Sequence, residues 1–256
     1  MQKIISYNVN GIRAATKKGL LDWLQEEKPD VLCIQETKAQ VDQLDESILK
    51  PEGYHTYWYS AEKKGYSGVA IFSRQEPRHV EYGCGIERFD SEGRVLRADF
   101  ENFSVISAYF PSGSSGDVRQ AVKEDFLDEM YVYLNELRKS FPNLIVSGDY
   151  NICHQAIDIH DPVRNKTNSG FLQHERDWVT KFLDSGFVDS FRKLYPDTPD
   201  KYSWWSYRAG ARGKNKGWRI DYNMIASPLE DKIKGADILS EVKHSDHCPI
   251  MVEVAV

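Results

Sequence analysis

Apolar residues recur along this chain in two patterns, short uninterrupted runs and spacings of three or four residues. Short runs rich in Val and Ile predict strands. We expect strands at Lys3–Val9, Val31–Gln35, His55–Tyr59, Val69–Ser73, Val95–Phe100, Val105–Phe110, Leu144–Ser147, Ile220–Ile225 and Ile250–Val254. The helical spacing predicts helices at Leu20–Glu27, about Val118–Lys139 and Glu175–Asp184. Many strands with few interleaved helices favour two packed sheets flanked by helices over a simple doubly wound sheet.

Polar side chains stand at or beside the ends of many predicted strands. They are Asn8 and Asn10 in "KIISYNVN", Glu36 in "VLCIQE", Tyr109 in "VISAYF", Asp149 and Asn151 in "LIVSGDYN", Asp221 in "RIDY", and Asp246 and His247 in "HSDH". In open α/β sheets, the strand ends at one edge form the ligand-binding crevice. We therefore expect these side chains to share one pocket, which the segment before the last strand completes.

Each of these residues also has an ordinary structural interpretation. Asn10 and Asn151, taken alone, are typical of turns, and Glu36 could form a salt bridge with Lys38. Asp221 is harder to explain in this way. It lies between Ile220 and Tyr222 and is therefore expected to be buried, and a buried charge needs a partner or a metal. The coincidence of so many polar residues at strand ends favours a shared site.

The chemistry of this set points to phosphate esters. Carboxylates and amides suit a hard cation such as Mg²⁺ or Mn²⁺ rather than zinc. An Asp flanked by Asn can position and deprotonate a water, and a His held protonated by an Asp can stabilise charge on a phosphoryl group. These parts together predict metal-assisted hydrolysis of a phosphate ester. The segment Ser112–Asp117, "SGSSGD", lacks the Lys of a P-loop and is predicted to be a loop.

The net charge and one basic segment give different indications about a nucleic-acid partner. The net charge of -6 over 256 residues argues weakly against a nucleic-acid partner. Between residues 201 and 219, however, there is no acid, and the basic residues are Lys201, Arg208, Arg212, Lys214, Lys216 and Arg219. Trp204, Trp205, Tyr207 and Trp218 are interleaved with them. A basic and aromatic segment is typical of a loop that contacts nucleic acid.

The remaining composition indicates the compartment. None of the four cysteines stands at CxxC spacing, so neither a zinc site nor a disulfide framework is predicted. The opening residues "MQKIISYNVNG" lack a signal-peptide pattern, and no apolar run has the length of a membrane span. We expect a cytoplasmic protein that forms a single domain over residues 1–256, with no membrane partner.

Eight motifs identify a family. They are "SYNVNGIRA", "CIQETK", "AYFPSG", "SGDYNI", "NKTNSGF", "WWSY", "GWRIDYNMIAS" and "SDHCPI", and they span nearly the whole chain. In this order they resemble the exonuclease III family of apurinic/apyrimidinic (AP) endonucleases, within the endonuclease/exonuclease/phosphatase superfamily. The resemblance implies a four-layer α/β sandwich, with two mixed β-sheets packed face to face, flanked by helices, and the site at one end.

The resemblance also implies residue roles. Glu36 would be the main Mg²⁺ ligand, with Asn8 and Asp246 near the ion, and Asp149, Asn151 and His247 are further candidates for contact with it. Asp149 would orient or deprotonate the attacking water, Asn151 and His247 would bind the scissile phosphate with His247 paired to Asp221, and Tyr109 would contact the phosphate or the leaving group. Candidate DNA-binding residues are Arg13, Asn165, Asn168, Arg208 and the pocket-forming Trp204 and Trp218.

The implied activity is Mg²⁺-dependent cleavage of duplex DNA 5′ to an abasic site in base excision repair, with accompanying 3′→5′ exonuclease and 3′-end-cleaning activity. Mn²⁺ is expected to substitute for Mg²⁺, and the protein is expected to be a monomer. Two departures from the family pattern stand out: Asn10 occupies a position where some members have Asp, and "SGSSGD" lacks the Arg that some members insert into the duplex. The sequence leaves two alternatives open: a phosphodiesterase or phosphatase of the same superfamily that acts on lipid or inositol phosphate, and a binding protein that has kept the fold but lost catalysis.

Overall fold

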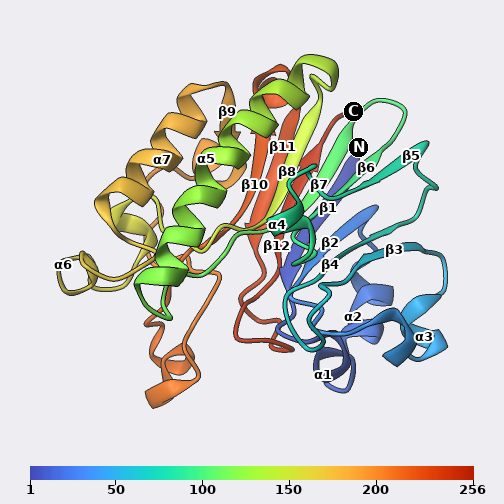
Figure 1. Cartoon of the computed structure of the whole chain (residues 1–256), viewed down its shortest axis with the longest axis horizontal. Coiled ribbons are helices and arrows are strands. Elements are labelled where there is room, and N and C mark those ends of the chain that lie inside the picture. The colour runs from blue at the N-terminus through green and yellow to red at the C-terminus, as the bar shows by residue number, and fades with distance from the viewer.

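The computed structural model describes residues 1–256 and contains two six-stranded sheets that pack face to face (Figure 1). The first sheet has the order β11 (Ile233–Ile238), β12 (Ile250–Val254), β1 (Gln2–Asn8), β2 (Val31–Gln35), β4 (Val69–Ser73) and β3 (His55–Tyr59). The second has the order β5 (His79–Tyr82), β6 (Val95–Asp99), β7 (Ser104–Tyr109), β8 (Leu144–Asp149), β10 (Asp221–Ala226) and β9 (Phe187–Asp189). With helices on the outer faces, this is the predicted four-layer sandwich.

Helices cover the outer face of each sheet, and Figure 1 shows α5 and α7 on one side of the molecule and α1, α2 and α3 on the other. The helices are α1 (Ile12–Thr16), α2 (Leu20–Glu27), α3 (Glu46–Leu49), α4 (Glu87–Asp90), α5 (Asp117–Ser140), α6 (Pro162–Asn165), α7 (Gln173–Asp184) and α8 (Ser190–Leu194). Short 3₁₀ turns are η1 (Val41–Gln43), η2 (Ala156–Asp158), η3 (Arg208–Gly210), η4 (Arg212–Lys214) and η5 (Ser227–Lys232). No helix combines the length and the apolar character needed to cross a bilayer.

The core lies in three layers of apolar side chains. Ile4, Val31 and Ile71 of the first sheet meet Val105 and Ile145 of the second between the two sheets. Central strands such as β2 and β8 are buried along their whole length, because side chains on one face pack against the other sheet and those on the opposite face pack against helices. This two-sided burial explains why they read as nearly continuous apolar runs.

One parallel pair at the centre of each sheet determines where the site forms. β1 runs parallel to β2, with Asn8 opposite Gln35, and β7 runs parallel to β8, with Tyr109 opposite Asp149. The antiparallel neighbour β10 brings Asp221 opposite Asp149 as well. Because parallel strands end at the same edge, the polar residues that follow them gather at one end of the sandwich.

Every strand predicted from an apolar run is present, with ends shifted by no more than a few residues. The strands β5, β9 and β11 were not predicted. β11 has the sequence IKGADI, in which Lys234 and Asp237 are exposed on an edge strand, so its apolar signal is diluted. β9 spans only three residues, and the helices α1, α3, α4, α6 and α8 are too short to show a helical period.

Candidate active site

An open cleft of about 810 Å³ lies at the end of the sandwich where the parallel strands finish. Most of the predicted site residues line it, namely Glu36, Tyr109, Asp149, Asn151, Asn168, Trp204, Arg208, Trp218, Asp246 and His247. Asn8 and Asp221 are buried directly behind this lining. Of the polar residues expected to share one pocket, Asn8 and Asp221 thus lie behind the lining and Asn10 does not line the cleft, while the others do.

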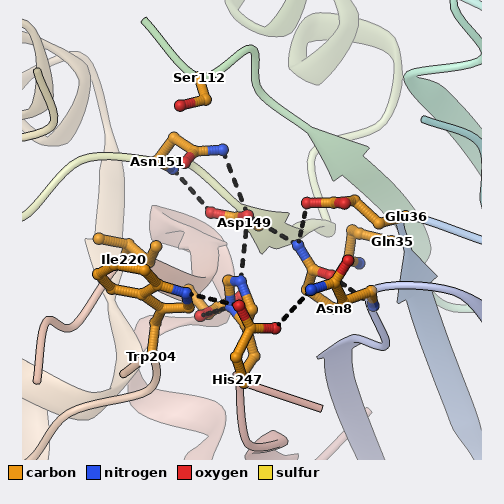
Figure 2. Close-up of polar contacts among 12 residues, drawn as sticks. Asn8, Gln35, Glu36, Ser112, Asp149, Asn151, Trp204, Ile220 and His247 are labelled. Carbon is orange, nitrogen blue, oxygen red and sulfur yellow. Dashed lines mark hydrogen bonds and ion pairs between the residues drawn. The ribbon is translucent and has the colours of Figure 1, made fainter. Parts of the chain in front are cut away.

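Asp149 lies at the centre of the cleft floor (Figure 2). Its carboxylate accepts hydrogen bonds from the side-chain amide of Asn8 at 2.9 Å and from the backbone N–H of Asn151 at 2.8 Å. The Asn151 side chain donates to it at 3.3 Å and to the carbonyl of Phe110 at 2.9 Å. Asn151 has a φ of 54°, so it is both a turn former and a site residue, the two interpretations that its sequence position left open.

His247 is paired with Asp221 behind the floor. Its Nδ1 lies 2.9 Å from Asp221 Oδ2, which also accepts the Ser203 hydroxyl at 2.6 Å. The Nε2 atom faces Asp149 Oδ2 at 3.9 Å (Figure 2). Burial lowers the pKa of His247, but the charges of Asp221 and Asp149 outweigh it, so the pKa lies above its ordinary value. At neutral pH the imidazole is therefore protonated, with Nε2–H directed toward the cleft.

The same neighbouring charges also change the pKa of Asp149. Burial raises the pKa of Asp149, and Asp221 and Glu36 raise it further against the opposing charge of His247. Asp149, Asp221 and His247 place ligand atoms within 4.8 Å of one another, a spacing that a metal could span. We interpret these three residues as a group that keeps His247 protonated and not as a metal site, because the imidazole Nδ1 and the Asp221 carboxylate are already hydrogen-bonded to each other.

Glu36 and Asp246 supply the carboxylates on either side of this floor. Glu36 accepts from Asn8 at 3.0 Å and pairs with Lys38 at 2.5 Å, so the salt bridge predicted as an alternative is present. Asp246 accepts from Asn10 at 2.9 Å. Burial opposes ionisation of both, but Lys38 at Glu36 and His247 with Asn10 at Asp246 lower the two pKa values overall.

These two carboxylates are therefore anionic and face the cleft, which is the donor set that a hard cation such as Mg²⁺ prefers. Asn8 lies beneath them with no exposed surface, and its amide nitrogen bridges Glu36 and Asp149. Its side-chain oxygen accepts the backbone N–H of Asn10 at 2.9 Å. Asn8 thus fixes the spacing between a carboxylate of the first sheet and one of the second.

Tyr109 closes the floor at the end of β7. Burial and the charges of Glu36 and Asp149 raise the pKa of Tyr109 well above its ordinary value, so the phenol stays protonated and can donate. Arg94 donates to the Tyr109 carbonyl at 2.9 Å, and its guanidinium lies 4.9 Å from the centre of the Tyr109 ring. No sequence pattern pointed to Arg94, which directly precedes β6 and also pairs with Glu92.

Two tryptophans form one wall of the cleft. The rings of Trp204 and Trp218 lie 6.0 Å apart at 88°, and their backbones exchange two hydrogen bonds of 2.9 Å. Both are half-buried against an apolar cluster that contains Phe171 and Ile220. Trp204 also donates its indole N–H to Asp246 at 3.0 Å (Figure 2). They are wall residues that reach the cleft, rather than fully buried core aromatics.

The basic segment from residue 201 to 219 is less basic on its surface than its sequence indicates. Arg212 turns inward, donates to the carbonyls of Ser245, Ser240 and Val242, and stacks on Trp205 at 4.6 Å. Arg219 is buried in ion pairs with Asp158 and Asp189. These two arginines therefore do not add to the exposed basic surface of the segment, because their acidic and carbonyl partners come from remote parts of the chain. Arg208 remains exposed at the cleft.

Two predicted DNA-binding residues lie outside the cleft. Arg13 lines a separate depression of about 640 Å³ together with Lys17 and Lys38. The Asn165 side chain donates to the carbonyls of His160 and Asp161 and accepts from Asn168 at 2.8 Å. Of the two asparagines in "NKTNSGF", only Asn168 lines the cleft.

Sequence reasoning missed Ser203, Lys123 and Glu175. Ser203 holds Asp221, but a Ser in a loop carries no signal. Lys123 and Glu175 did carry one, because each falls on the apolar face of its helix, Lys123 with Phe126 and Met130, and Glu175 with Trp178 and Phe182. A charge at an apolar helix position indicates a buried ion pair.

The fold and the cleft together define a hydrolase of phosphate esters, with a protonated imidazole and an aspartate on the floor between two anionic carboxylates. Residues 5–230 match the family model described as the endonuclease/exonuclease/phosphatase family. The chain belongs to this family.

Curated relatives confirm the exonuclease III resemblance. The chain is 49% identical to an exodeoxyribonuclease of Bacillus subtilis, with 97% of each chain covered. It is 44% identical to the DNA repair nuclease APEX1 of Danio rerio, covering 99% of this chain and 82% of that protein.

Solved structures agree. An AP endonuclease from Archaeoglobus fulgidus superposes with a TM-score of 0.90 at 33% identity, with all of both chains covered. A 3′-5′ exonuclease from Neisseria meningitidis superposes with a TM-score of 0.92 at 27% identity, covering 99% of this chain and 100% of that one.

Proposed function

We propose that this protein is a Mg²⁺-dependent DNA repair nuclease that hydrolyses the phosphodiester 5′ to abasic sites in duplex DNA, leaving a 3′-hydroxyl. It also acts as a 3′→5′ exonuclease and removes blocking groups from 3′ ends. It works as a monomer with one catalytic domain, in the cytoplasm. The observation that carries the proposal is the Asp149–His247–Asp221 arrangement between Glu36 and the tryptophan wall.

Asp149 orients the attacking water and accepts its proton. In its ionised form it is a stronger base than an ordinary carboxylate, because burial and the neighbouring acids raise its pKa. His247, kept protonated by Asp221, donates from Nε2 to a non-bridging oxygen of the scissile phosphate, where negative charge grows in the transition state. The Asn151 side chain is held by Phe110 and Asp149 and contributes to binding the same phosphate.

Glu36 and Asp246 would hold the Mg²⁺, with the amide side chains of Asn8 and Asn151 as further candidate ligands. Asp149 and His247 would act on the water and the phosphate beside it. When bound, the ion supplies a Lewis acid that neutralises charge on the phosphate and the leaving oxygen. Mn²⁺ has the same preference for oxygen ligands and substitutes for it. Tyr109, as a neutral phenol, donates to the phosphate or to the leaving group.

DNA is the substrate class that the relatives favour. The solved relative from Neisseria described as a 3′ phosphatase is bound to a product DNA hairpin, and it superposes with a TM-score of 0.92 at 27% identity. In this chain Asn168 and Arg208 line the cleft and contact the DNA backbone, while Trp204 and Trp218 receive the sugar that lacks a base. Arg13 and Asn165 contact DNA further from the cleft.

End-labelled product analysis tests the proposal. The substrates are a duplex with one abasic site, a blunt duplex and a duplex with a 3′-phosphate, each with Mg²⁺ or with EDTA. We expect a single Mg²⁺-dependent nick 5′ to the abasic site, with trimming of 3′ ends. Asp149→Asn is the inactive control. Hydrolysis of inositol phosphates without nicking of abasic DNA would replace this function with that of a small-molecule phosphatase.

A further inference from the structure

A lysine and a glutamate that are both inaccessible to solvent lie behind the cleft. Lys123 comes from α5 and Glu175 from the first turn of α7, and Lys123 Nζ lies 2.5 Å from Glu175 Oε1. A buried ion pair is weak evidence for stability, because well-packed apolar residues often serve as well or better. The other hydrogen bonds of this pair connect it to residues of the cleft.

Glu175 holds the chain that faces Trp218. Its Oε2 accepts the backbone N–H of Gly170 at 2.7 Å and that of Leu172 at 3.0 Å. Gly170 has a φ of 94°, and a Cβ at this position would stand 3.0 Å from the Trp218 ring. Glu175 therefore fixes the backbone N–H groups of Gly170 and Leu172, and Gly170 stands close to the Trp218 indole at the cleft.

Lys123 connects this wall to the catalytic floor. Besides Glu175, its ammonium donates to the carbonyl of Asn151 at 2.9 Å. Asn151 in turn donates its backbone N–H to Asp149 at 2.8 Å. Gln120, one helical turn before Lys123 and itself at the cleft, donates to Glu175 at 3.1 Å. One buried pair thus joins α5, α7, the floor and the wall.

We propose that the side-chain oxygen of Glu175, buried beside Lys123, positions the backbone of residues 170–172 against Trp218 and so determines selectivity for a nucleotide without a base. The inference rests on the proposed function, since that function requires the cleft to distinguish an abasic sugar from an intact nucleotide. Neither residue touches the substrate. A wall free to move would admit a sugar that carries a base, and a displacement of about 1 Å can change rates on the order of 100-fold.

Two double variants distinguish the hydrogen bonds that Glu175 accepts from the 170–172 backbone from the charges of the pair. Lys123→Met with Glu175→Ala removes both charges, so neither is left buried alone, and also removes the acceptor for Gly170 and Leu172. Lys123→Met with Glu175→Gln also removes both charges but keeps one side-chain oxygen that can accept both N–H groups. Arg97→Met with Asp99→Asn is the matched control, because this buried pair lies at the end of β6 away from the cleft.

Two measurements are made on each variant below its melting temperature. One is the ratio of cleavage rates for an abasic duplex and for the same duplex with a normal nucleotide at that position. The other is amide hydrogen exchange across residues 168–173. For Lys123→Met with Glu175→Ala we expect faster exchange and a selectivity ratio lowered on the order of 10- to 100-fold. The variant with Glu175→Gln and the β6 control keep both values near those of the wild type.

Three results would overturn the inference: unchanged exchange in the variant with Glu175→Ala, faster exchange with an unchanged ratio, or an equal loss of selectivity in the β6 control. A wild-type enzyme that leaves the abasic duplex uncut would instead overturn the proposed function. The exchange measurement would then still decide whether Glu175 holds the 170–172 backbone, so the two failures are distinguishable.

Discussion

At the scale of single residues, the cleft gives neighbouring carboxyl groups different pKa values. Glu36 and Asp246 have lowered pKa values because cations and hydrogen-bond donors surround them. Asp149 has a raised pKa because burial and two neighbouring acids disfavour its charge. Carboxylates whose pKa values are pushed apart in this way can take different roles, as metal ligand and as base.

Glu36→Ala should impair metal use above all. The variant loses a cleft-facing carboxylate and leaves Lys38 without its partner, so a divalent ion binds more weakly. We expect the Mg²⁺ concentration for half-maximal activity to rise, with activity partly restored at high Mg²⁺. Titration of activity against Mg²⁺ measures this directly. A variant with the wild-type Mg²⁺ dependence would exclude Glu36 as a principal ligand.

Asp149→Asn and His247→Ala should lower turnover far more than affinity for DNA. Loss of a positioned acid or base typically reduces the rate by about 10²–10⁴-fold, whereas phosphate contacts elsewhere still bind the duplex. Single-turnover rates and equilibrium binding to an uncleavable abasic duplex separate the two effects. Should binding fall and turnover per bound complex stay constant, these residues would only dock DNA.

At the scale of elements, an ion-pair network fixes the segment that carries Trp218. Asp158 in η2 accepts from Arg219 at 2.8 Å and from Arg192 of α8 at 2.6 Å, while Arg219 also pairs with Asp189 of β9. Burial raises the pKa of Asp158, but the two guanidinium groups outweigh it and lower the pKa to about 2. Three segments far apart in the sequence are thereby joined next to the cleft wall.

This network should stabilise the fold in a pH-dependent way. The pKa of Asp158 falls from an ordinary value of 3.8 in the unfolded chain to about 2 in the folded protein. Its contribution, roughly 2 kcal/mol, is therefore present above pH 4 and lost as the pH falls toward 2. Urea unfolding of wild type and Asp158→Asn should differ clearly at pH 7, and the difference should shrink below pH 4 and vanish as the pH falls through about 2. A pH-independent difference would show that shape, not charge, is what Asp158 contributes.

At the scale of elements, the sequence could predict the central strands and the residues at their ends, but not the contacts between remote segments. A strand buried on both faces, such as VLCIQ in β2, must be apolar throughout, and it was found from its pattern. The residues that follow such strands, including Glu36 and Asp149, are placed by the backbone, so their convergence could also be predicted. Arg219 could not be placed, because its partner Asp158 is 61 residues away in sequence and only tertiary packing brings them together.

At the scale of the whole molecule, a net charge of -6 has to coexist with binding to a polyanion. The structure reduces the exposed basic surface further, since Arg212 and Arg219 are committed to internal contacts. Arg208 stays exposed at the cleft, Arg13 and Lys17 line the second depression, and Lys201, Lys214 and Lys216 are also exposed. The cations at the cleft would attract the phosphates of a duplex to this face.

Binding should therefore weaken steeply with salt, and Arg208 should account for part of this dependence. Arg208→Gln should reduce the slope of log affinity against log salt by about 1, because one phosphate contact and its counterion release are lost. Arg212→Gln is the control, and it should lower the melting temperature while leaving the slope unchanged. An equal change of slope in both variants would show that Arg212 also meets DNA.

The pairing of β1 with β12 has a consequence for the cell while the protein is being made. Asn8 leaves the ribosome well before Asp246 and His247, which stand more than 200 residues later in the segment that leads into β12. Domains fold as their parts become available during synthesis. Nascent chains and prematurely terminated fragments that end before β12 therefore lack the antiparallel neighbour of β1 and the His247 imidazole, so the nuclease becomes able to cut DNA only when β12 is in place.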